Sequence, residues 1–542
     1  MRTISLLDCT LRDGGYLNDW NFGHQHLMSI YGRLVDSGVD IVEIGFLDER
    51  RPFDVNRSIM PDEECAGRIW GGVKRKAPMT VGMIDYGTCG LSHLRPQKES
   101  FLDGIRVIFK KERSAEAMDF CAGVKELGYK VFSQLVSVTA YEDEELRAIA
   151  ERANQVKPYA LSMVDTYGLL DPEQLIHIFS ILDETLDPSI RIGFHAHNNM
   201  QLAFANSLAF LKHETQRSLI VDGTIFGMGK SAGNAPLELL MDHMNACCGK
   251  NYELAAVLEA LEESILEFRT RFVWGYQLPF FLSARNRCHP AYVNLYRNKE
   301  ELSVAGLDRM LSGIEPAEKK LLYDKELAEE HYKEYLTGEG DDEKAYAGLK
   351  KRFENKALLL VGPGKNIRLQ KDAVKEYVEK KKPLVISVNY LPEDLHCDYV
   401  LATKTNRYQQ MLEKLQTMGE ECCCVIATEN VECLHGHEVI RLQREPLLER
   451  EERFCDNSFL MLLRILKRIG VTEAACAGFD GYSRVEENYF NPQMEYVFVR
   501  EEAERMNRHM REAITGEFAS IRLDFITYSR YTEVEDTDRA GF

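Results

Sequence analysis

The sequence predicts an α/β protein with two parts, an N-terminal (β/α)₈ TIM barrel and a smaller Rossmann-like α/β domain. In the first 300 residues, eight short apolar runs alternate with amphipathic stretches, a pattern typical of a parallel sheet. Eight units in about 250 residues match the size of a barrel, whereas an open doubly wound sheet usually has about five to seven strands. The chain is 45% hydrophobic and 28% charged, ordinary values for a globular protein.

The barrel elements follow one another at regular intervals along the chain. The expected strands are Ile4–Leu7, Ile41–Phe46, Met79–Ile84, Gly104–Ile108, Val131–Val136, Ala160–Val164, Arg191–Phe194 and Leu219–Asp222. Helical periodicity is found between most of them, at His26–Ser37, Ala115–Leu127, Asp143–Ala153, Pro172–Leu182 and Met200–His213. We therefore assign residues 1–298 to the barrel.

The composition changes after the barrel. Residues 299–353 are charged, and we expect a helical extension over Glu301–Leu336 and a polar linker tip at Gly338–Asp342. Residues 354–542 alternate strands and helices again and form the second α/β domain. Its expected strands are Ala357–Val361, Leu384–Val388, Tyr399–Ala402, Cys423–Ala427, Val439–Leu442 and Ala474–Gly478, and its expected helices include Ala373–Lys380 and Phe459–Ile469.

Charge and patterning exclude several classes of partner. With 67 basic and 86 acidic residues the net charge is −19, which repels phosphate backbones, so no nucleic-acid partner is expected. The longest stretch without charged residues, Ile192–Leu211, carries many polar side chains and predicts no membrane span. The N-terminus has no signal-peptide pattern, and we expect a cytoplasmic protein. The 14 cysteines include no CxxC pair, so a structural zinc site is not expected.

Polar groups follow five of the barrel strands at the end where such barrels carry their active sites. Asp8–Gly15 follows the first strand, Glu43 lies in the second, and Asp165–Gly168 follows the sixth. His195–Asn199 ends the seventh strand, and the glycine-rich stretch Gly227–Glu238 follows the eighth. Five segments far apart in the sequence therefore meet at one rim.

His195 and His197 indicate a metal site. Residues i and i+2 of an extended segment face the same side, so both imidazoles can point into the barrel mouth. Two imidazoles and a carboxylate suit a divalent ion such as Mn²⁺, Zn²⁺ or Fe²⁺, and Asp13 would supply the carboxylate. The alternative is a pair of structural histidines, which the other rim motifs disfavour.

Arg12 and Glu43 point to the stabilisation of negative charge. Arg12 is permanently cationic and could hold a developing enolate or a carboxylate. Glu43 lies in an apolar strand, where an unpaired carboxylate is costly, so we expect it to pair with Arg12. A surface salt bridge for Arg12 and another cation as the partner of Glu43 are the alternatives.

The rim motifs together resemble the metal-dependent lyases and aldolases that include 3-hydroxy-3-methylglutaryl-CoA (HMG-CoA) lyase, isopropylmalate synthase and 4-hydroxy-2-oxovalerate aldolase. The matching residues are Asp8-x-Thr10-Leu11-Arg12-Asp13-Gly14, Glu43, Asp165-Thr166-x-Gly168, His195-x-His197-Asn198 and Ala232–Glu238, the last most like the 4-hydroxy-2-oxoacid aldolases. The resemblance implies Asp13, His195 and His197 as metal ligands, Asn234 as a further ligand, and Arg12 as the group that stabilises a pyruvate enolate.

The resemblance also implies the cofactor and substrates. Mn²⁺ is the metal expected first, with Mg²⁺, Zn²⁺ and Co²⁺ as alternatives, and the substrates are a small 2-oxo acid and an aldehyde. We expect Asp165 and Asn199 to bind substrate. A homo-oligomer is compatible with the sequence.

The chain departs from the aldolase pattern at one catalytic position. The aldolases have a histidine shortly after the Arg-Asp-Gly turn as general base, and here Tyr16 takes that position. An ordinary tyrosine pKa near 10 makes a poor base at pH 7, so His24, His26 or a metal-bound water would substitute. The alternatives to an aldolase are a Claisen-type acyl transferase or HMG-CoA lyase-like enzyme, and a non-catalytic barrel that binds a metabolite.

Two glycine motifs were considered as phosphate sites. Gly229-Lys230-Ser231 is like the end of a P-loop, but Thr224 replaces the first glycine, which excludes it. Gly362-Pro363-Gly364 follows a strand but lacks the third glycine, so a tight turn and a phosphate cradle are equally compatible.

The second half resembles, more faintly, the Rossmann-like domains of bacterial sialyltransferase-type proteins. The segments that carry the resemblance are Leu358–Gly364, Val385–Asn389 and Ala477–Tyr482. It implies that Asn389 and Asp480 line a cleft for a nucleotide or nucleotide-sugar. A non-catalytic domain for binding or assembly is the alternative.

Overall fold

The computed structural model describes residues 2–73, 78–296, 304–337, 342–417, 423–431, 433, 438–449, 457–491 and 500–532. The chain divides into two compact units. The first comprises Met1–Leu295 and Leu307–Asp324, and the second comprises Tyr296–Gly306 and Lys325–Phe542. Among the helices of the described residues, none combines the length and apolar character needed to cross a bilayer.

The first unit contains a closed barrel of eight parallel strands, which confirms the predicted fold. The barrel strands are β1 (Ile4–Asp8), β2 (Ile41–Leu47), β4 (Met79–Asp85), β5 (Gly104–Phe109), β6 (Lys130–Leu135), β7 (Ala160–Asp165), β8 (Arg191–Ala196) and β9 (Leu219–Gly223). Strand β1 pairs with both β2 and β9, and this double pairing closes the barrel. The short strand β3 (Ile59–Met60) extends the sheet beside β2.

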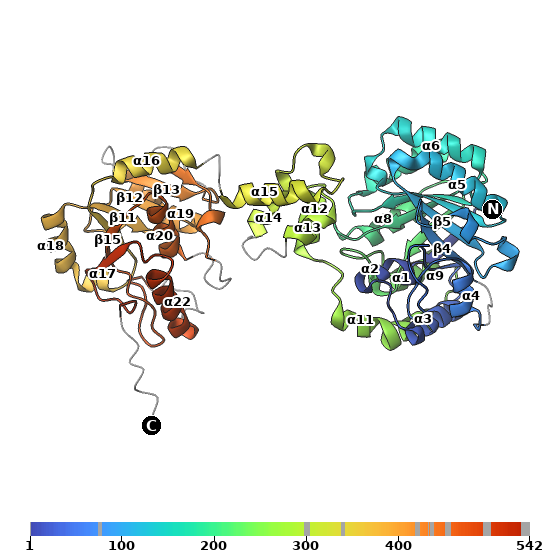
Figure 1. The fold of residues 1–542 in the computed structure, drawn as a ribbon, viewed down its shortest axis with the longest axis horizontal. Helices are drawn as coiled ribbons and strands as arrows, with labels where there is room; N and C mark the ends of the chain where they lie inside the picture. The colour runs from blue at the N-terminus through green and yellow to red at the C-terminus, as the bar shows by residue number, and fades with distance from the viewer. Residues whose placement is uncertain are drawn as a thin grey trace, which may run out of the picture. The chain divides into compact units, whose positions relative to one another are not determined.

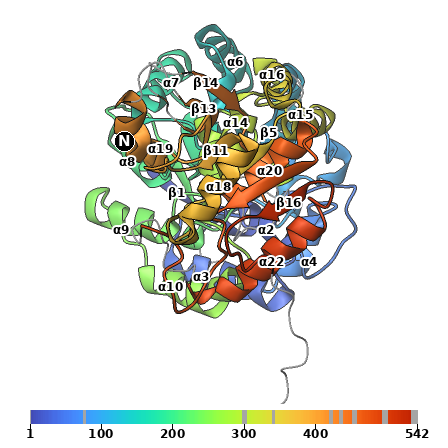
Figure 2. The same ribbon diagram turned by 90° about the vertical axis from the view of Figure 1, so that its left-hand side faces the viewer.

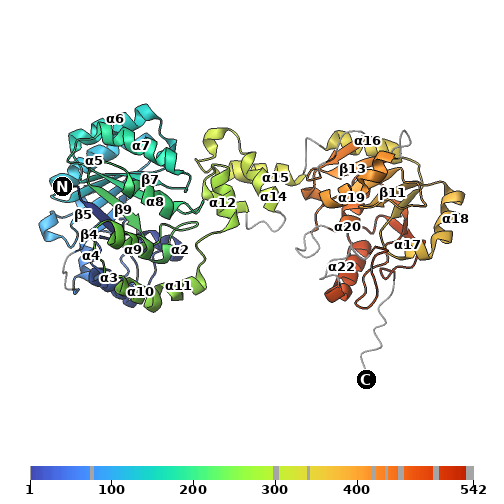
Figure 3. The same ribbon diagram turned by 180° about the vertical axis from the view of Figure 1, so that it is seen from behind.

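Helices surround the barrel strands (Figure 1 and Figure 3). They include α3 (His24–Ser37), α5 (Ser114–Glu126), α6 (Asp143–Val156), α7 (Pro172–Thr185), α8 (Ala203–Lys212), α9 (Leu237–Cys247) and α10 (Leu254–Ala260). The helix expected to begin at Met200 begins at Ala203 instead. Gln201 has a positive φ of 60° and its amide closes a turn on the Asn198 carbonyl, so the chain is not yet helical there.

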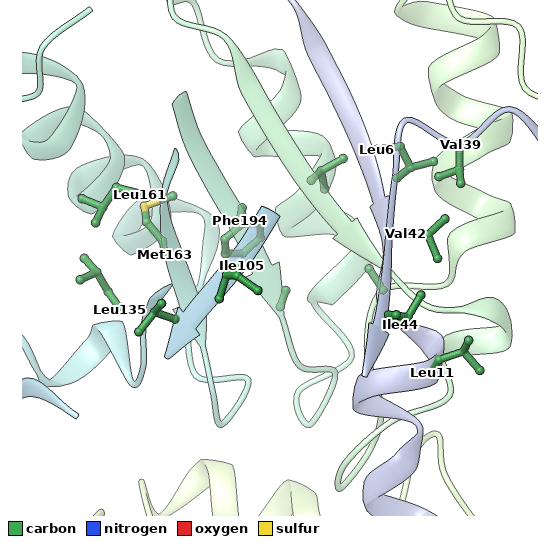
Figure 4. Close-up of a cluster of buried hydrophobic side chains, with 14 of the residues drawn as sticks. Leu6, Leu11, Val39, Val42, Ile44, Ile105, Leu135, Leu161, Met163 and Phe194 are labelled. Atoms are coloured by element: carbon green, nitrogen blue, oxygen red, sulfur yellow. The ribbon is translucent and has the colours of Figure 1, made fainter. Parts of the chain in front are cut away.

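Side chains alternate between the two faces of the barrel sheet because successive strand residues point to opposite sides. Val42, Ile44 and Ile105 belong to the apolar layer between strands and helices (Figure 4). Glu43 lies between Val42 and Ile44, and Arg106 follows Ile105. Both charged residues are buried and belong to the opposite face, which is the barrel interior. The same alternation that builds the core therefore places two charged side chains inside the barrel.

Further helices follow the barrel. They include α11 (Leu266–Arg271), α12 (Leu278–Arg285), α13 (Pro290–Tyr296), α14 (Val304–Ser312) and α15 (Lys325–Thr337), and the last two fall in the expected helical extension. Of the tip expected at Gly338–Asp342, residues 338–341 lie outside the described residues. Within the first unit, the Cys288 thiol donates to the Leu311 carbonyl at 3.3 Å and the Tyr292 hydroxyl to the Lys319 carbonyl at 2.9 Å.

The second unit is built on a parallel sheet of seven strands, in agreement with the expected α/β domain. The order is β14-β13-β12-β11-β10-β15-β16. The strands are β10 (Leu358–Val361), β11 (Leu384–Val388), β12 (Tyr399–Ala402), β13 (Cys424–Thr428), β14 (Val439–Leu442), β15 (Glu473–Ala477) and β16 (Arg522–Phe525). The order reverses at β10, which is a topological switch point. Strand β16 was not predicted, because Arg522 and Asp524 interrupt its apolar pattern at the sheet edge.

Helices cover both faces of this sheet (Figure 2). Residues of α16 (Glu343–Phe353), α20 (Ser458–Arg468) and α22 (Ala503–Thr515) join one apolar cluster. Residues of α18 (Lys371–Lys381) and α19 (Thr405–Thr417) join the other. Burial on both faces explains why the central strands are continuous apolar runs.

Candidate metal centre

A tight helical turn after β1 places Arg12 and Asp13 at the carboxyl end of the barrel. This turn, α1 (Thr10–Asp13), is fully buried. The adjoining glycines are required by close packing, since a Cβ at Gly15 would lie 2.0 Å from the Trp20 indole. The Trp20 Nε1 donates to the Arg12 carbonyl at 2.8 Å. The glycines after Asp13 thus let the indole fix the turn that carries both charged residues.

Asp13, His195 and His197 come together as predicted. One ligand atom from each lies within 4.8 Å of the others, and all three side chains are buried. The Asp13 Oδ2 is 3.5 Å from His195 Nε2 and 3.9 Å from His197 Nε2. The two imidazole rings, 5.1 Å apart between centroids, face a common point near the carboxylate. This is the juxtaposition that the i, i+2 spacing predicted.

Three buried polar atoms of these residues and Asn234 have no hydrogen-bond partner among the residues that the structure describes. They are His195 Nε2, His197 Nδ1 and Asn234 Oδ1. A buried polar atom without a partner costs about 1–3 kcal/mol, so a group of them requires an explanation. Asn234 pairs with His197 through an isolated backbone bridge, which brings its side chain to the site. An imidazole nitrogen, an amide oxygen and a carboxylate oxygen are donors that suit a divalent cation, so the residues fit a metal ion.

The protonation states of His197 and Asp13 favour coordination. Burial lowers the pKa of His197 to about 3, so its imidazole is neutral at pH 7. Burial opposes the charge on Asp13, but Arg12 and the two histidines outweigh it and hold the pKa of Asp13 well below its usual range. A neutral imidazole beside an ionised carboxylate is the state in which both groups donate electron pairs to a metal.

Charged residues form a closed ring inside the barrel. Glu43 Oε2 accepts hydrogen bonds from Arg12 Nε at 2.8 Å and from Arg106 Nη1 at 2.9 Å. The other side of the Arg106 guanidinium donates to Asp222 and to Gln134. Asp222 Oδ2 lies 3.1 Å from His195 Nδ1, and the ring closes through the contact between Arg12 and Asp13.

The ring sets the orientation of Arg12 and His195. Glu43 holds Arg12, in agreement with the expected pairing. Asp222 contacts His195 Nδ1, which leaves Nε2 as the coordinating nitrogen, as outer carboxylates do in metal sites. Arg106 connects the two carboxylates from the centre of the barrel.

A second group of ligand-type residues, Cys9, His195 and Asp222, lies next to the first. The Cys9 Sγ is 3.9 Å from His195 Nδ1. Burial raises the pKa of the Cys9 thiol well above its usual range, so the sulfur stays protonated and is a poor ligand. The group formed by Asp13, His195 and His197 is therefore the better metal site.

Other predicted residues lie at the same rim with different contacts. Asp165 accepts hydrogen bonds from the amides of Leu169 and Leu170 at 2.8 and 3.1 Å and closes the loop after β7. Asn199 accepts from the Ala232 amide at 3.1 Å, while its buried Nδ2 has no partner. Their roles in substrate binding stay predictions.

Tyr16 lies at the rim, with 40% of its side chain exposed. Packing against Trp20 and Phe46 removes water from part of the ring, and this desolvation raises the pKa of its hydroxyl. Its hydroxyl is therefore protonated at pH 7. His26, a candidate to replace it, contacts Ser264 and Glu267.

Three residues at the site were not predicted. Arg106 and Asp222 lie within apolar strand runs. They are 116 positions apart in the sequence, and only the tertiary fold shows that they are in contact. Lys230 belongs to the Gly229-Lys230-Ser231 sequence, which is like the end of a P-loop but lacks the first glycine of that motif. Its amide donates to Asp13 Oδ1 at 2.9 Å, and its Nζ lies 5.3 Å from the Tyr16 ring centroid. A Cβ at Gly229 would lie 2.1 Å from Asn234 Nδ2, so the glycine is needed for this close approach.

A comparison with known families gives a match over part of the barrel. The model of the HMGL-like family matches residues 106–261, which begin in β5 and end just after α10.

Proteins similar in sequence to this chain are aldolase and lyase enzymes. The chain is 27% identical over 252 residues to a 4-hydroxy-2-oxovalerate aldolase of Marinomonas sp. The aligned region covers 45% of this chain and 70% of the aldolase. It is 28% identical over 252 residues to an oxaloacetate decarboxylase of Mycobacterium tuberculosis. This alignment covers 46% of this chain and 72% of the decarboxylase. A solved hydroxymethylglutaryl-CoA lyase of Pseudomonas aeruginosa is similar with a TM-score of 0.40 and 16% identity, over 48% of this chain and 91% of the lyase.

Proposed function

We propose that the protein is a divalent-metal-dependent aldolase that cleaves a 4-hydroxy-2-oxoacid to pyruvate and an aldehyde, or joins them in the reverse direction. The observation that carries the proposal is the convergence of Asp13, His195 and His197 next to the buried guanidinium of Arg12. The aldolases among the relatives support it. Mn²⁺ is the metal that we propose first.

Asp13, His195, His197 and Asn234 would hold the metal. Bound there, a divalent ion would act as a Lewis acid toward the oxygens of the 2-oxo acid. The neighbouring protein groups then decide how the substrate lies. Because the site is buried, their charges act in a medium of low dielectric constant, where electrostatic stabilisation is stronger than in water.

Arg12 would stabilise the negative charge that develops as the C3–C4 bond breaks. Its guanidinium is 5% exposed and is held on one edge by Glu43, so it is fixed before the substrate arrives. A preorganised cation costs no reorganisation during the reaction. Glu43 is a positioning residue for Arg12.

Lys230 and Tyr16 would bind the substrate at the mouth of the site. The Lys230 ammonium lies above the Tyr16 ring and can pair with the substrate carboxylate. The Tyr16 hydroxyl is protonated at pH 7 and can donate a hydrogen bond to an oxygen of the substrate. This assigns Tyr16 the role of a donor, which its raised pKa suits better than the role of a base.

The test is to incubate the purified protein with Mn²⁺ and a panel of 4-hydroxy-2-oxoacids and to measure pyruvate. His197→Ala should abolish pyruvate formation, whereas His177→Ala, a histidine exposed on α7, should not change it. Oxaloacetate is included, because one relative is a decarboxylase and loss of CO₂ from oxaloacetate would give the same enolate. Free CoA released from an acyl-CoA, with no pyruvate from any oxo acid, would identify an acyl transferase or HMG-CoA lyase-like enzyme instead. Metal binding without turnover of any substrate would identify a non-catalytic barrel.

A further inference from the structure

The second unit has a cavity at the switch point of its sheet. The cavity has a volume of about 240 Å³. Its lining residues are Ile367, Arg368, Lys371, Val374, Lys375, Tyr390, Leu391, Pro392, Glu393, Asp394, Leu395 and Phe490. They come from the segments that follow β10, β11 and β15, the three neighbouring strands where the order reverses. Ligands of doubly wound sheets bind in the crevice beyond the carboxyl ends of the strands at this point.

The glycine turn that follows β10 is occupied by the protein itself. The amides of Gly362 and Gly364 donate to the carbonyls of Ala477 and Gly478, each at 2.8 Å. The Asn366 amide donates to Asp480 Oδ2 at 2.8 Å. A Cβ at Gly362 would lie 2.5 Å from the Gly478 carbonyl oxygen, so packing of backbone against backbone accounts for this glycine. These amides have no free hydrogen for a phosphate.

The polar residues expected to line a nucleotide cleft are also engaged with the protein. Asn389 donates from Nδ2 to the hydroxyls of Thr403 and Ser458 at 2.9 and 2.7 Å and accepts from the Thr403 amide at 2.9 Å. Asp480 fixes the turn through Asn366, although its Oδ1 has no partner. Neither residue lines the cavity. A ligand at the switch point would therefore contact other side chains.

The cavity wall is apolar inside and charged at the rim. Ile367, Val374, Tyr390 and Leu391 are buried, and the Phe490 ring lies 5.2 Å from that of Tyr390. This interior suits a flat ring, since aromatic side chains stack on the π-face of any base.

Three cations lie at the rim. Lys371 and Lys375 are four residues apart on α18, so their side chains lie on the same face of the helix. In the described part of the chain neither lysine has an ion-pair partner, which leaves both charges available. Arg368 stacks on Phe490 at 4.5 Å from the ring centroid. Three cations next to an aromatic ring are suited to phosphate oxygens attached to a ring system.

Two carboxylates lie beside the cations at the rim. Glu393 and Asp394 follow β11, the second strand of the domain, and both are exposed. Glu393 Oε2 is 4.0 Å from Arg368 Nη2, whereas Asp394 is not paired with a cation in the described part of the chain. A carboxylate after the second strand accepts hydrogen bonds from ribose hydroxyls in the dinucleotide-binding members of the doubly wound folds. The rim therefore offers acceptors for hydroxyl groups beside cations for phosphates.

We propose that this cavity binds a nucleoside diphosphate. The base lies in the apolar interior against Tyr390 and Phe490, the phosphates contact Lys371, Lys375 and Arg368, and the ribose hydroxyls donate to Glu393 or Asp394. The site lies wholly in the second unit and does not depend on the function proposed for the barrel. A nucleotide would be bound by side chains instead of the glycine turn that the sequence suggested.

The test is a calorimetric titration of the full-length protein with ADP, GDP, UDP and CDP, and with pyrophosphate as the probe without a nucleoside. At least one nucleotide should bind with a Kd below about 1 mM, the weak end of the affinity scale. In the double variant Lys371→Ala/Lys375→Ala the Kd should rise at least tenfold. The matched control is Lys380→Ala/Lys381→Ala, which removes two exposed lysines from the same helix outside the cavity and should leave the Kd unchanged.

A second variant tests the nucleoside part of the proposal. Phe490→Ala should weaken nucleotide binding at least threefold. Asp13→Ala, in the barrel, should leave nucleotide binding unchanged. The proposal is overturned if no nucleotide binds, if pyrophosphate binds as tightly as the nucleotides, or if the two lysine pairs behave alike. A binding loss in Asp13→Ala would place the nucleotide in the barrel and would also overturn it.

Discussion

The carboxyl edges of the two parallel sheets carry similar residue types but use them differently. At the barrel edge, His195, His197 and Asn234 each keep a buried polar atom without a protein partner. At the edge of the second sheet, Asn389 and the amides of Gly362 and Gly364 bond to neighbouring protein groups. Position at a strand end thus does not make a residue functional. What distinguishes the barrel edge is that a carboxylate and two imidazoles bring ligand-type atoms within 4.8 Å of one another.

Loss of a metal ligand is the largest effect expected from this comparison. Asp13→Ala should remove most of the bound metal and nearly all turnover, because it deletes the carboxylate that two imidazoles and Arg12 surround. Metal content by mass spectrometry and pyruvate release measure both effects. Asp165→Ala removes another buried carboxylate of the same rim and should leave the metal bound. Equal metal content in the two variants would remove Asp13 from the site.

Replacement of Arg106 comes next. Arg106→Ala leaves Glu43 and Asp222 buried without their shared cation, which should cost about 3–5 kcal/mol in the free energy of unfolding. Arg113→Ala removes an exposed arginine that pairs with Glu116 and should leave the free energy of unfolding nearly unchanged, because solvent screens surface ion pairs. Denaturant unfolding of both variants gives the difference. If Arg106→Ala is as stable as Arg113→Ala, the ring of charges is not what holds the barrel interior.

Replacement of Arg12 should lower turnover. Arg12→Ala should lower kcat by about 10²–10³, the size of effect seen when one electrostatic donor is removed. Arg12→Lys should restore little of this, because a single ammonium does not reproduce the planar fork that contacts Glu43 through Nε and Asp13 through Nη1. Steady-state kinetics give the answer. Turnover of Arg12→Ala within a factor of about three of wild type, about 0.6 kcal/mol, would exclude the proposed role.

Removal of the second domain should have the smallest effect on the chemistry. A chain that ends near Gly340 keeps the segment 307–324 that bonds to Cys288 and Tyr292, and it should remain soluble, bind metal and turn over at nearly the full rate. A chain that ends near Cys288 loses these contacts and should aggregate. Solubility, metal content and pyruvate release are compared with those of the full chain. If the longer fragment binds metal but is inactive, the second domain contributes to the reaction.

The sequence predicted most of the fold and the convergence of Asp13, His195 and His197, for identifiable physical reasons. Strand ends were predictable because apolar runs and turns are local, and the two histidines because i, i+2 spacing fixes a common face. The link from Arg106 to Asp222 was not predictable, since nothing local marks which inward residues of β5 and β9 meet. Lys230 was overlooked because its glycine neighbours were considered only as a phosphate motif. At the edge strand β16, charged residues concealed the apolar pattern.

The most direct test of the account is to locate the metal. Crystals grown with Mn²⁺ and measured for anomalous scattering should show one strong peak among Asp13, His195, His197 and Asn234. In Asp13→Asn crystals, which keep the shape of the side chain but remove its charge, that peak should be weak or absent. A peak at Cys9 and Asp222, or no peak inside the barrel at saturating Mn²⁺, would contradict the assignment of the metal centre.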